Sequence, residues 1–377
     1  MRLPDFIPPG DPLPPAYPLD LMLCEMCGLL QLKDVTPRSE LYHERYGFKS
    51  GINEAIRADL ADVVKSALEF VPSPGQWLDI ASNDGTLLAS VPAHVRRYGV
   101  DPLAQFAAEA SQHADDIIVG YFDPDEFYHG QFDVITAVSM FYDLADPRQF
   151  VTGVRRVLSR DGIWVIQMNY SLEMLRNFAV DNVGHEHVTY YGVAPLQELL
   201  RSEGMDIVRV TYSPVNGGCF RAFVSHRGRF TVERSVSEAV HTEHDVIINR
   251  ARTWERWFSE VERELNKTRV LLDHIRDQGQ RCLLYGASTR IGTVLQMIDV
   301  HSGLIQAAVE RNPDKVGKVM GATGIPVISE EQMRANPPEF MLIGPYFFRD
   351  VFVEREKEYL KSGGKMIFPL PRFEVVQ

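Results

Sequence analysis

The chain has 377 residues, of which 45% are hydrophobic and 24% are charged. These proportions are typical of a globular protein and exclude the disordered and fibrous classes, while the length predicts two domains. The formal net charge of −12 argues against a nucleic-acid surface, which needs clustered Lys and Arg. No apolar run approaches the ~20 residues of a membrane span. We therefore expect neither nucleic acid nor a membrane as a partner.

The N-terminal stretch and the cysteines indicate a cytoplasmic protein. The first 20 residues are rich in proline and carry acids, unlike a secretory signal. Four cysteines (Cys24, Cys27, Cys219 and Cys282) are too few for a disulfide framework in a chain of this size. Composition does not distinguish a monomer from a dimer.

The hydrophobic periodicity predicts an α/β protein with two Rossmann-like sheets. A helix over 56–71 precedes a strand at 76–80, and helices and strands then alternate to residue 170. A strand, a glycine turn and a second strand follow over 205–226, and helical periodicity continues to about 277. A second α/β pattern begins near 280. We predict a cap at 1–57, a cofactor domain at 58–205, a strand pair and helical bridge at 206–279, and a second Rossmann-like domain at 280–377.

The turn after the first strand, LDIASNDGTLL at 78–88, is comparable to the glycine-rich turn that receives a nucleotide or nucleoside cofactor. Gly85 is its only glycine, but Ala81 and Asn83 stand where glycines often stand, and Asn tolerates a left-handed backbone. Any α/β protein can contain a packed strand-to-helix turn of this kind. The turn alone therefore leaves cofactor binding and simple packing as alternatives.

Three further features favour S-adenosylmethionine. Asp101 ends the second strand, where a carboxylate can accept hydrogen bonds from both ribose hydroxyls. Phe122 and Asp123 follow the third strand, where they can contact an adenine. The order of elements over 132–167 is that of a class I methyltransferase sheet. The expected cofactor contacts are Asp79, Ala81, Asn83, Asp84, Gly85, Leu87, Asp101, Pro102, Phe122, Asp123, Val138 and Ser139.

A second glycine turn, YGASTRIG at 285–292, makes NAD the competing cofactor. No acidic residue lies at the usual distance after it. The turn can simply pack, or the helix start after Ser288 and Thr289 can hold a diphosphate. Both interpretations stay open on the residues alone.

The chain resembles the C-methyltransferases that act on nucleotide-linked deoxysugars in antibiotic and polysaccharide pathways. The resemblance covers almost the whole chain and rests, in order, on PLDLMLCEMCGLLQL, LDIASNDGTLL, GVDP, HEHVTYY, NGG, YGAST, ERNPDKVGK, IPVISEE and GGKMIFPLP. It implies a zinc-bearing N-terminal lobe, a central S-adenosylmethionine domain and a C-terminal Rossmann-like domain that helps to hold the nucleotide sugar.

The chain departs from this family at several positions. Members usually carry two CxxC pairs on one zinc, whereas only Cys24 and Cys27 are present here, and a structural zinc needs four ligands. We therefore expect a degenerate lobe and no metal. Gly184 stands where the family often has Tyr, and Asp143 and Asn216 stand where it commonly has His. These changes leave the acceptor open.

The segment HEHVTYY at 185–191 is the expected catalytic element. Methylation of carbon usually requires removal of a proton, which a neutral imidazole can accept near neutral pH. The resemblance implies that His187 is this base, that Glu186 orients it, and that His185 is catalytic or structural. A buried structural histidine and an HxH metal pair are the alternatives for either ring. Asp143, Tyr142, Tyr190 and Asn216 are expected to hold acceptor oxygens, although each can instead pack or form a turn.

The leading hypothesis is an S-adenosylmethionine-dependent C-methyltransferase that acts on C3 of a nucleotide-linked 4-keto-deoxysugar, with Ser288 and Thr289 near its diphosphate. A C-methyltransferase of another metabolite, such as an indole at C3, is the second hypothesis. An NAD-dependent oxidoreductase and a binding protein without turnover are less favoured.

Overall fold

The computed structural model describes residues 1–44, 46–246 and 248–377, which form two compact units. The first unit contains Met1–Asp20, Met174–His185 and Arg252–Gln377, and the second contains Leu21–Glu173 and Glu186–Ala251. The chain therefore crosses between the units several times, once between His185 and Glu186. The predicted boundaries at 57, 205 and 279 stay predictions.

The second unit is built on a seven-stranded sheet with the order β10-β11-β8-β7-β4-β5-β6. The strands are β4 (Gln76–Ile80), β5 (Arg96–Asp101), β6 (Asp116–Val119), β7 (Phe132–Val138), β8 (Leu158–Asn169), β10 (Met205–Ser213) and β11 (Cys219–His226). The first five are parallel, while β11 runs antiparallel between β8 and β10. This is the class I methyltransferase topology, so the predicted fold class is confirmed.

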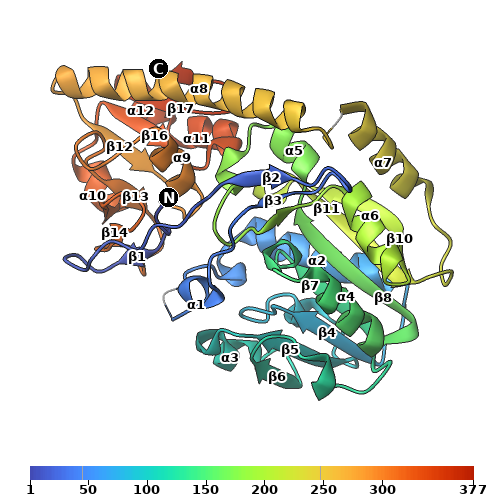
Figure 1. Ribbon diagram of the computed structural model, residues 1–377. Coiled ribbons are helices and arrows are strands. Elements are labelled where there is room, and N and C mark those ends of the chain that lie inside the picture. The colour runs from blue at the N-terminus through green and yellow to red at the C-terminus, as the bar shows by residue number, and fades with distance from the viewer. Residues whose placement is uncertain (45, 247) are drawn as a thin grey trace. The chain divides into compact units, whose positions relative to one another are not determined.

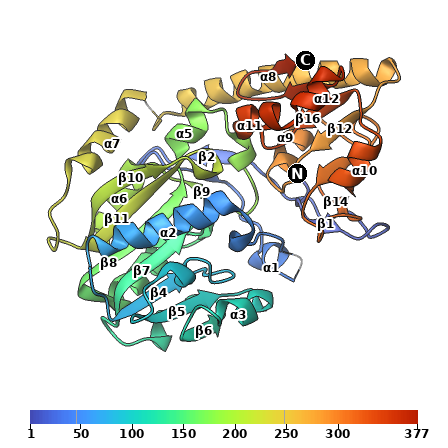
Figure 2. The same ribbon diagram turned by 180° about the vertical axis from the view of Figure 1, so that it is seen from behind.

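Helices cover both faces of this sheet. Figures 1 and 2 show α2 (Glu54–Leu68) on one face and α4 (Pro147–Val157) and α6 (Val193–Ser202) on the other. The apolar side of α2 packs through Leu60, Val63 and Val64 into a core that includes Trp77. Asn53 begins α2 by accepting a hydrogen bond from the Ala55 N–H group at 2.9 Å. The short helices of this unit are α1 (Arg38–Leu41) and α3 (Ala104–Ala110).

A small sheet joins the N-terminal hairpin to the HEH segment. Its strands β2 (Leu21–Leu23), β3 (Leu30–Leu32) and β9 (Thr189–Tyr190) are antiparallel, with Leu30 opposite Tyr190. The hairpin turn carries Cys24 and Cys27, both free thiols. Among the described residues, no group of three or more His, Cys, Asp and Glu side chains is arranged to hold a metal ion.

The first unit contains an eight-stranded sheet with the order β1-β14-β15-β13-β12-β16-β17-β18. Its parallel centre comprises β12 (Cys282–Tyr285), β13 (Ala308–Glu310), β15 (Ile325–Ser329), β16 (Phe340–Ile343) and β17 (Lys365–Phe368), and its remaining strands are β1 (Phe6–Ile7), β14 (Val319–Met320) and β18 (Glu374–Val376). The helices of this part are α9 (Ile291–Met297), α10 (Glu330–Ala335), α11 (Arg349–Arg355) and α12 (Lys357–Lys361). The predicted second Rossmann-like sheet is therefore present. Figure 1 shows the blue β1 beside the orange β14 at its edge.

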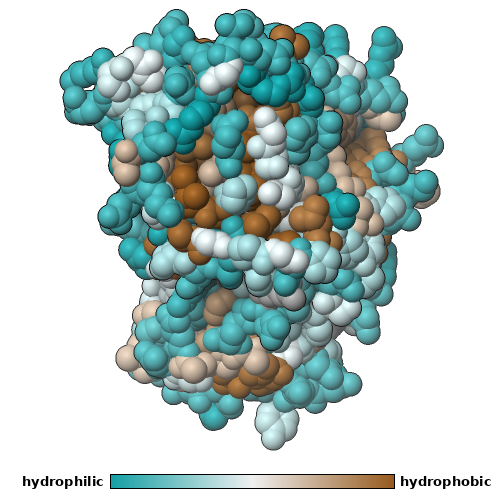
Figure 3. Space-filling model, turned by 90° about the vertical axis from the view of Figure 1, so that its left-hand side faces the viewer, coloured by the Kyte–Doolittle hydropathy of each residue, from teal (hydrophilic) through white to brown (hydrophobic). Residues whose placement is uncertain are grey.

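The helical region expected up to residue 277 consists of two helices, α7 (Arg234–Val246) and α8 (Ala251–Asp277). The buried side of α8 includes Trp254, Trp257 and Leu265. In the described ranges, no helix, α8 included, is long and apolar enough to span a membrane. Figure 3 shows hydrophilic side chains over most of one face of the molecule, with hydrophobic ones gathered in separate patches.

Helix α7 is attached to α6 by a buried carboxylate. Glu243 is only 2% exposed and accepts hydrogen bonds from the Val193 and Ala194 N–H groups at 2.5 and 2.9 Å. The Tyr170 hydroxyl also donates to it, at 2.8 Å. The first N–H groups of a helix lack partners within the helix, so Glu243 satisfies the start of α6 from outside.

We expect Glu243→Ala to lower the free energy of unfolding by about 2–3 kcal/mol, because two buried N–H groups and a hydroxyl lose their acceptor. Glu238→Ala on the same helix, which removes an exposed pair with Arg234, serves as the control and should cost less than about 0.5 kcal/mol. Urea unfolding of both variants measures the difference. Equal losses would contradict a capping role for Glu243.

Candidate active site

The turn after β4 has an unusual backbone. Ala81, Asn83 and Gly85 have φ angles of 61°, 49° and 78°. A left-handed alanine costs about 1–2 kcal/mol, and strain of this kind is often kept at functional sites. A side chain at Gly85 would lie 2.8 Å from Cα of Ala110, so only glycine fits there. The turn thus has the backbone that the positions of Ala81 and Asn83 in the sequence indicated.

Asp101 fixes this turn from the neighbouring strand. Its carboxylate accepts hydrogen bonds from the Asn83 N–H group at 2.8 Å and the Leu103 N–H group at 2.9 Å. Burial raises the pKa of Asp101, although the two N–H groups act in the opposite direction. The carboxylate therefore stands at the carboxyl ends of two adjacent parallel strands, where ligands of such sheets bind.

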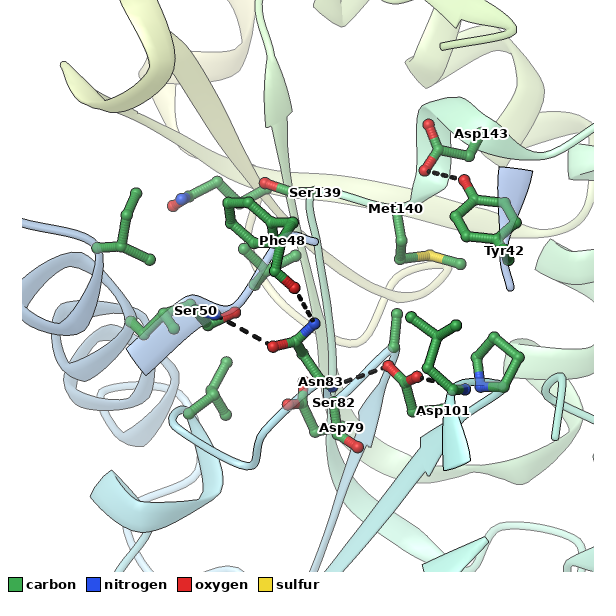
Figure 4. Close-up of a pocket in the computed structure, with 18 of the residues that line it drawn as sticks. Tyr42, Phe48, Ser50, Asp79, Ser82, Asn83, Asp101, Ser139, Met140 and Asp143 are labelled. Carbon is green, nitrogen blue, oxygen red and sulfur yellow. Dashed lines mark hydrogen bonds between the residues drawn. The ribbon is translucent and has the colours of Figure 1, made fainter. Parts of the chain in front are cut away.

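The Asn83 side chain connects the turn to the N-terminal segment. Its Oδ1 accepts from the Ser50 N–H group at 3.1 Å, and its Nδ2 donates to the Phe48 carbonyl at 3.2 Å. Asp84 accepts from the Gly51 N–H group at 2.8 Å. Figure 4 shows Phe48 and Ser50 on one side of Asn83 and Asp101 on the other.

A cavity lies between this segment and the carboxyl edge of the sheet, entirely within the second unit (Figure 4). Eight of the expected cofactor residues line it: Asp79, Ala81, Asn83, Leu87, Asp101, Pro102, Val138 and Ser139. Asp143 and Asn216 line the same cavity. One cavity therefore contains residues expected for cofactor and for acceptor.

The remaining four residues expected to contact the cofactor are not among those that line the cavity. Asp84 and Gly85 shape the turn without being among the lining residues. The Phe122 ring packs against Phe150 with centroids 5.3 Å apart, and Asp123 caps a short 3-10 helix. Tyr121 lines the cavity instead.

Several lining residues were not predicted. Arg38, Tyr42, Tyr46 and Phe48 come from the N-terminal segment, and the aromatic run at 41–48 was its only signal in the sequence. Asp59 and Gln167 also line the cavity and are hydrogen-bonded at 2.5 Å.

The pair of Asp59 and Gln167 belongs to a buried network around Arg221, which is 3% exposed. Arg221 donates to Gln167 at 2.8 Å and to Asp62 at 2.9 Å, and its guanidinium lies 3.5 Å from Asp59. A buried charge needs such partners. The network links α2 to β8 and β11 beneath the cavity.

Asp79 is a buried carboxyl at the end of β4. It accepts a hydrogen bond from the Thr136 hydroxyl at 2.6 Å. Burial raises its pKa to about 7, and the nearby Asp101 adds to the effect. Asp79 therefore titrates near neutrality in the folded protein.

Asp143 forms the opposite wall with Tyr42, as Figure 4 shows. The Tyr42 hydroxyl donates to Asp143 Oδ2 at 2.9 Å, whereas the buried Oδ1 has no hydrogen-bond partner among the described residues. Burial, followed by the charge of Glu186, holds the pKa of the Asp143 carboxyl well above its usual range. The raised pKa favours the protonated form of this carboxyl, and in that form it can donate a hydrogen bond.

The HEH segment divides between the two units. The His187 ring contacts the Tyr142 ring edge to face, with centroids 4.5 Å apart. Tyr142 is buried, and its carbonyl accepts from the Thr189 hydroxyl at 3.1 Å. His185 belongs to the first unit, where its ring lies 3.4 Å from the Tyr17 carbonyl and burial lowers its pKa. His187, Glu186 and Asp143 are thus neighbours, while His185 has the contacts of a structural residue.

Of the three remaining expected acceptor contacts, Ser288 and Thr289 are in the first unit and Tyr190 is in the second. The Ser288 hydroxyl accepts from the Ile291 N–H group at 3.3 Å at the start of α9, and Thr289 is exposed. Tyr190 is buried in β9. Their contacts with an acceptor stay predictions.

The cavity fits S-adenosylmethionine. Asp101 offers a carboxylate for a ribose diol, and the aromatic rings of Tyr42, Tyr46, Phe48 and Tyr121 suit an adenine and a cationic sulfonium. Ser82 also lines the cavity, and its buried hydroxyl has no hydrogen-bond partner in the described part of the chain.

The pKa of Asp79 predicts a pH-dependent stability. The folded value of about 7 exceeds the unfolded value of about 4, so ionisation opposes folding increasingly as the pH rises between them. Without ligand, Asp79→Asn should gain stability relative to the natural protein from pH 4 to 7, by up to about 4 kcal/mol, and no more above pH 7. Unfolding across this range measures it, with the exposed Asp116→Asn as control. A difference that does not change with pH would contradict the raised pKa.

The Asn83 side chain is hydrogen-bonded to the backbone of Ser50 and Phe48, and we expect loss of these two bonds to weaken cofactor binding. Asn83→Gly keeps the left-handed backbone accessible but removes both bonds to the N-terminal segment. We expect about tenfold weaker binding of S-adenosylhomocysteine by calorimetry, since two hydrogen bonds that order the site are lost. Asn312→Ala, which removes a turn bond to Asp314 in the first unit, should leave the affinity unchanged. Unaltered affinity in Asn83→Gly would show that the segment does not help to form the cofactor site.

Two family models match the chain. A methyltransferase domain matches residues 52–210, and a C-methyltransferase C-terminal domain matches residues 214–371. C-methyltransferase NovU of Streptomyces niveus is 24% identical over 379 residues, which cover 96% of this chain and 88% of NovU.

Solved methyltransferases resemble less than half of the chain. N-methyltransferase NodS of Bradyrhizobium japonicum WM9, in complex with S-adenosyl-L-homocysteine, has 17% identity and a TM-score of 0.37, covering 47% of this chain and 90% of NodS. Magnesium protoporphyrin IX methyltransferase of Synechocystis PCC 6803 has 13% identity and a TM-score of 0.38, covering 46% of this chain and 84% of its own. A methyltransferase domain is thus followed by a C-methyltransferase C-terminal domain, and these matches, together with the likeness to NovU, indicate that the protein is an S-adenosylmethionine-dependent C-methyltransferase.

Proposed function

We propose that the protein methylates C3 of a nucleotide-linked 4-keto-deoxysugar and that His187 removes the C3 proton. The observation that carries the proposal is that the His187 ring packs against Tyr142, whose neighbour Asp143 lines the cavity with the expected cofactor residues, although His187 and Tyr142 are not themselves lining residues. The resemblance in sequence to deoxysugar C-methyltransferases supplies the acceptor class. The C-methyltransferase match of the C-terminal domain supports attack by carbon rather than by oxygen or nitrogen.

Bound S-adenosylmethionine supplies an electrophilic methyl carbon on its sulfonium. The carbonyl at C4 of the acceptor acidifies the proton at C3, and an imidazole nitrogen of His187 accepts that proton. The electron pair of the broken C–H bond becomes the C3–C4 enolate, whose C3 is the nucleophile for the methyl carbon. The proton leaves His187 to solvent after the transfer.

Asp143 has the properties needed to stabilise the enolate. The pKa of its carboxyl is raised well above the usual range, its Oδ2 accepts from Tyr42, and in the protonated form its buried Oδ1 is left to donate to the C4 oxygen. A preorganised donor of this kind stabilises the charge that develops on the oxygen. Glu186 favours this neutral form, since its charge raises the pKa of Asp143 further.

An indole C3 carbon is the second candidate acceptor. The cavity has four aromatic rings, Tyr42, Tyr46, Phe48 and Tyr121, which suit a flat aromatic molecule. At Gly184, where the resembled family often has Tyr, no heavy atom of the described residues, apart from its chain neighbours, lies within 4 Å of the position that a Cβ would take. Cytoplasmic residence, the absence of nucleic-acid partners and the oligomeric state stay predictions.

The two histidines of the HEH segment give matched variants. His187→Asn should lower the rate of methyl transfer about 10³-fold, as expected for loss of a general base, without changing the affinity for S-adenosylhomocysteine. His185→Asn, in a buried structural position, should lower it less than tenfold. Mass spectrometry of a dTDP-4-keto-6-deoxyhexose incubated with S-adenosylmethionine measures the added methyl group. Equal activity of the two variants would contradict the role of His187, and methylation of a tryptophan-derived indole alone would favour the second acceptor.

A further inference from the structure

The segment that leads into the HEH sequence belongs to the first unit. After β8 the chain enters α5 (Ser171–Arg176), and residues 174–185 pack with the C-terminal sheet. Thr293 on α9 donates to the Val183 carbonyl at 2.7 Å, a buried hydrogen bond. The segment is therefore held by the C-terminal domain until the residue before Glu186.

The anchor of this segment lies at the switch point of the C-terminal sheet. From β12 the chain proceeds through α9 to β13 on one side and later returns to β16 on the other. Ligands of doubly wound sheets bind in the crevice between two such strands, at their carboxyl ends. In this protein the loops after β12 and β16 are in close contact. A side chain at Gly286 would lie 2.6 Å from Pro345 Cδ, and one at Gly344 would collide with the Gly286 carbonyl oxygen.

Asp181 bridges these two loops. Its Oδ1 accepts from the Tyr346 hydroxyl after β16 at 2.5 Å, and its Oδ2 pairs with Arg290 after β12 at 2.7 Å. Asp181 and Tyr346 are 6% and 1% exposed. A carboxylate of the chain itself thus has the contacts that an anionic ligand would make in this crevice, and hydrogen bonds to a buried charge are among the stronger ones.

We propose that residues 178–183 permanently fill the ligand crevice of the C-terminal Rossmann-like domain, and that Asp181 is a positioning residue for His187. On this account the domain does not bind a dinucleotide at Gly286. It fixes one end of the HEH segment, while β9 fixes the other end in the second unit. Thr289 is exposed, so it stays accessible to an acceptor at the edge of the filled crevice. The effect of Asp181 on turnover rests on the proposed function of His187, whereas the filling of the crevice does not rest on it.

Hydrogen exchange read by mass spectrometry tests the anchor in the full-length protein without an acceptor. Asp181→Asn should accelerate exchange of the peptide 178–185 about tenfold to a hundredfold, because the bonds to the carboxylate are lost. Peptides of β4 and α2, and the affinity for S-adenosylhomocysteine, should not change. Tyr346→Phe should act in the same direction, and the double variant should exceed the larger single effect only slightly. Asp350→Asn, which removes an exposed pair with Arg349, is the control.

The outcomes separate the two proposals. Exchange of 178–185 that is equally fast in the natural protein and in Asp181→Asn, or protection of this peptide by NAD⁺, would overturn the filled crevice. On an acceptor that the natural protein methylates, Asp181→Asn should lower kcat about tenfold or more at unchanged KM for S-adenosylmethionine, and Asp181→Glu should recover part of it. An unchanged kcat despite faster exchange would overturn the positioning role. Failure of the natural protein to methylate the keto-sugar would contradict only the proposed acceptor.

Discussion

The hydrogen bond from the Asn83 N–H group to the buried Asp101 carboxylate is the contact on which the site depends. It joins the turn after β4 to the end of β5 and holds Asn83 in a left-handed conformation. From there the Asn83 amide binds the backbone at Phe48 and Ser50, so the wall formed by the N-terminal segment depends on the same residue. Burial of the Asp101 carboxyl and the left-handed backbone of the turn both cost free energy, and such costs are common at functional sites, which fits the cofactor site expected here.

The part of the cavity around Asp143, which we propose to be the reacting side, depends on the burial of two carboxyl groups near each other. Asp143 lies beside Glu186 in a buried environment, and two carboxylates so placed do not both ionise readily. The raised pKa favours the protonated carboxyl, which is a hydrogen-bond donor and suits the enolate oxygen of the proposed reaction. The Tyr142 ring packs against His187, and β9 holds the chain two residues later. Packing of this kind suits the proposed role of His187 as a base that must stay in reach of one carbon.

Much of the fold was predictable, because hydrophobic periodicity reports burial directly. The helix at Glu54–Leu68, the strands of both parallel sheets and the antiparallel pair β10 and β11 follow the expected pattern. The pairing of Phe6–Ile7 with Val319–Met320 was not predictable, since a two-residue strand has no periodicity and its partner is far away in the sequence.

The turn residues Ala81 and Asn83 could be recognised from their positions. Tyr42 could not, because its role arises only from its contact with Asp143, about 100 residues later. Phe122 shows the reverse case, in which a half-buried aromatic at the expected place packs against Phe150 and its neighbour Tyr121 lines the cavity.

The central claim is that His187 makes a carbon nucleophile by removing a proton from the carbon next to a ketone. Incubation of a dTDP-4-keto-6-deoxyhexose in D₂O with the protein and S-adenosylhomocysteine tests it directly, because deprotonation can then proceed while methyl transfer cannot. The account predicts incorporation of one deuterium at C3, seen by NMR, at a rate well above that without protein and lost in His187→Asn. Methylation of the same sugar by S-adenosylmethionine without any such exchange, or exchange that persists in His187→Asn, would contradict it.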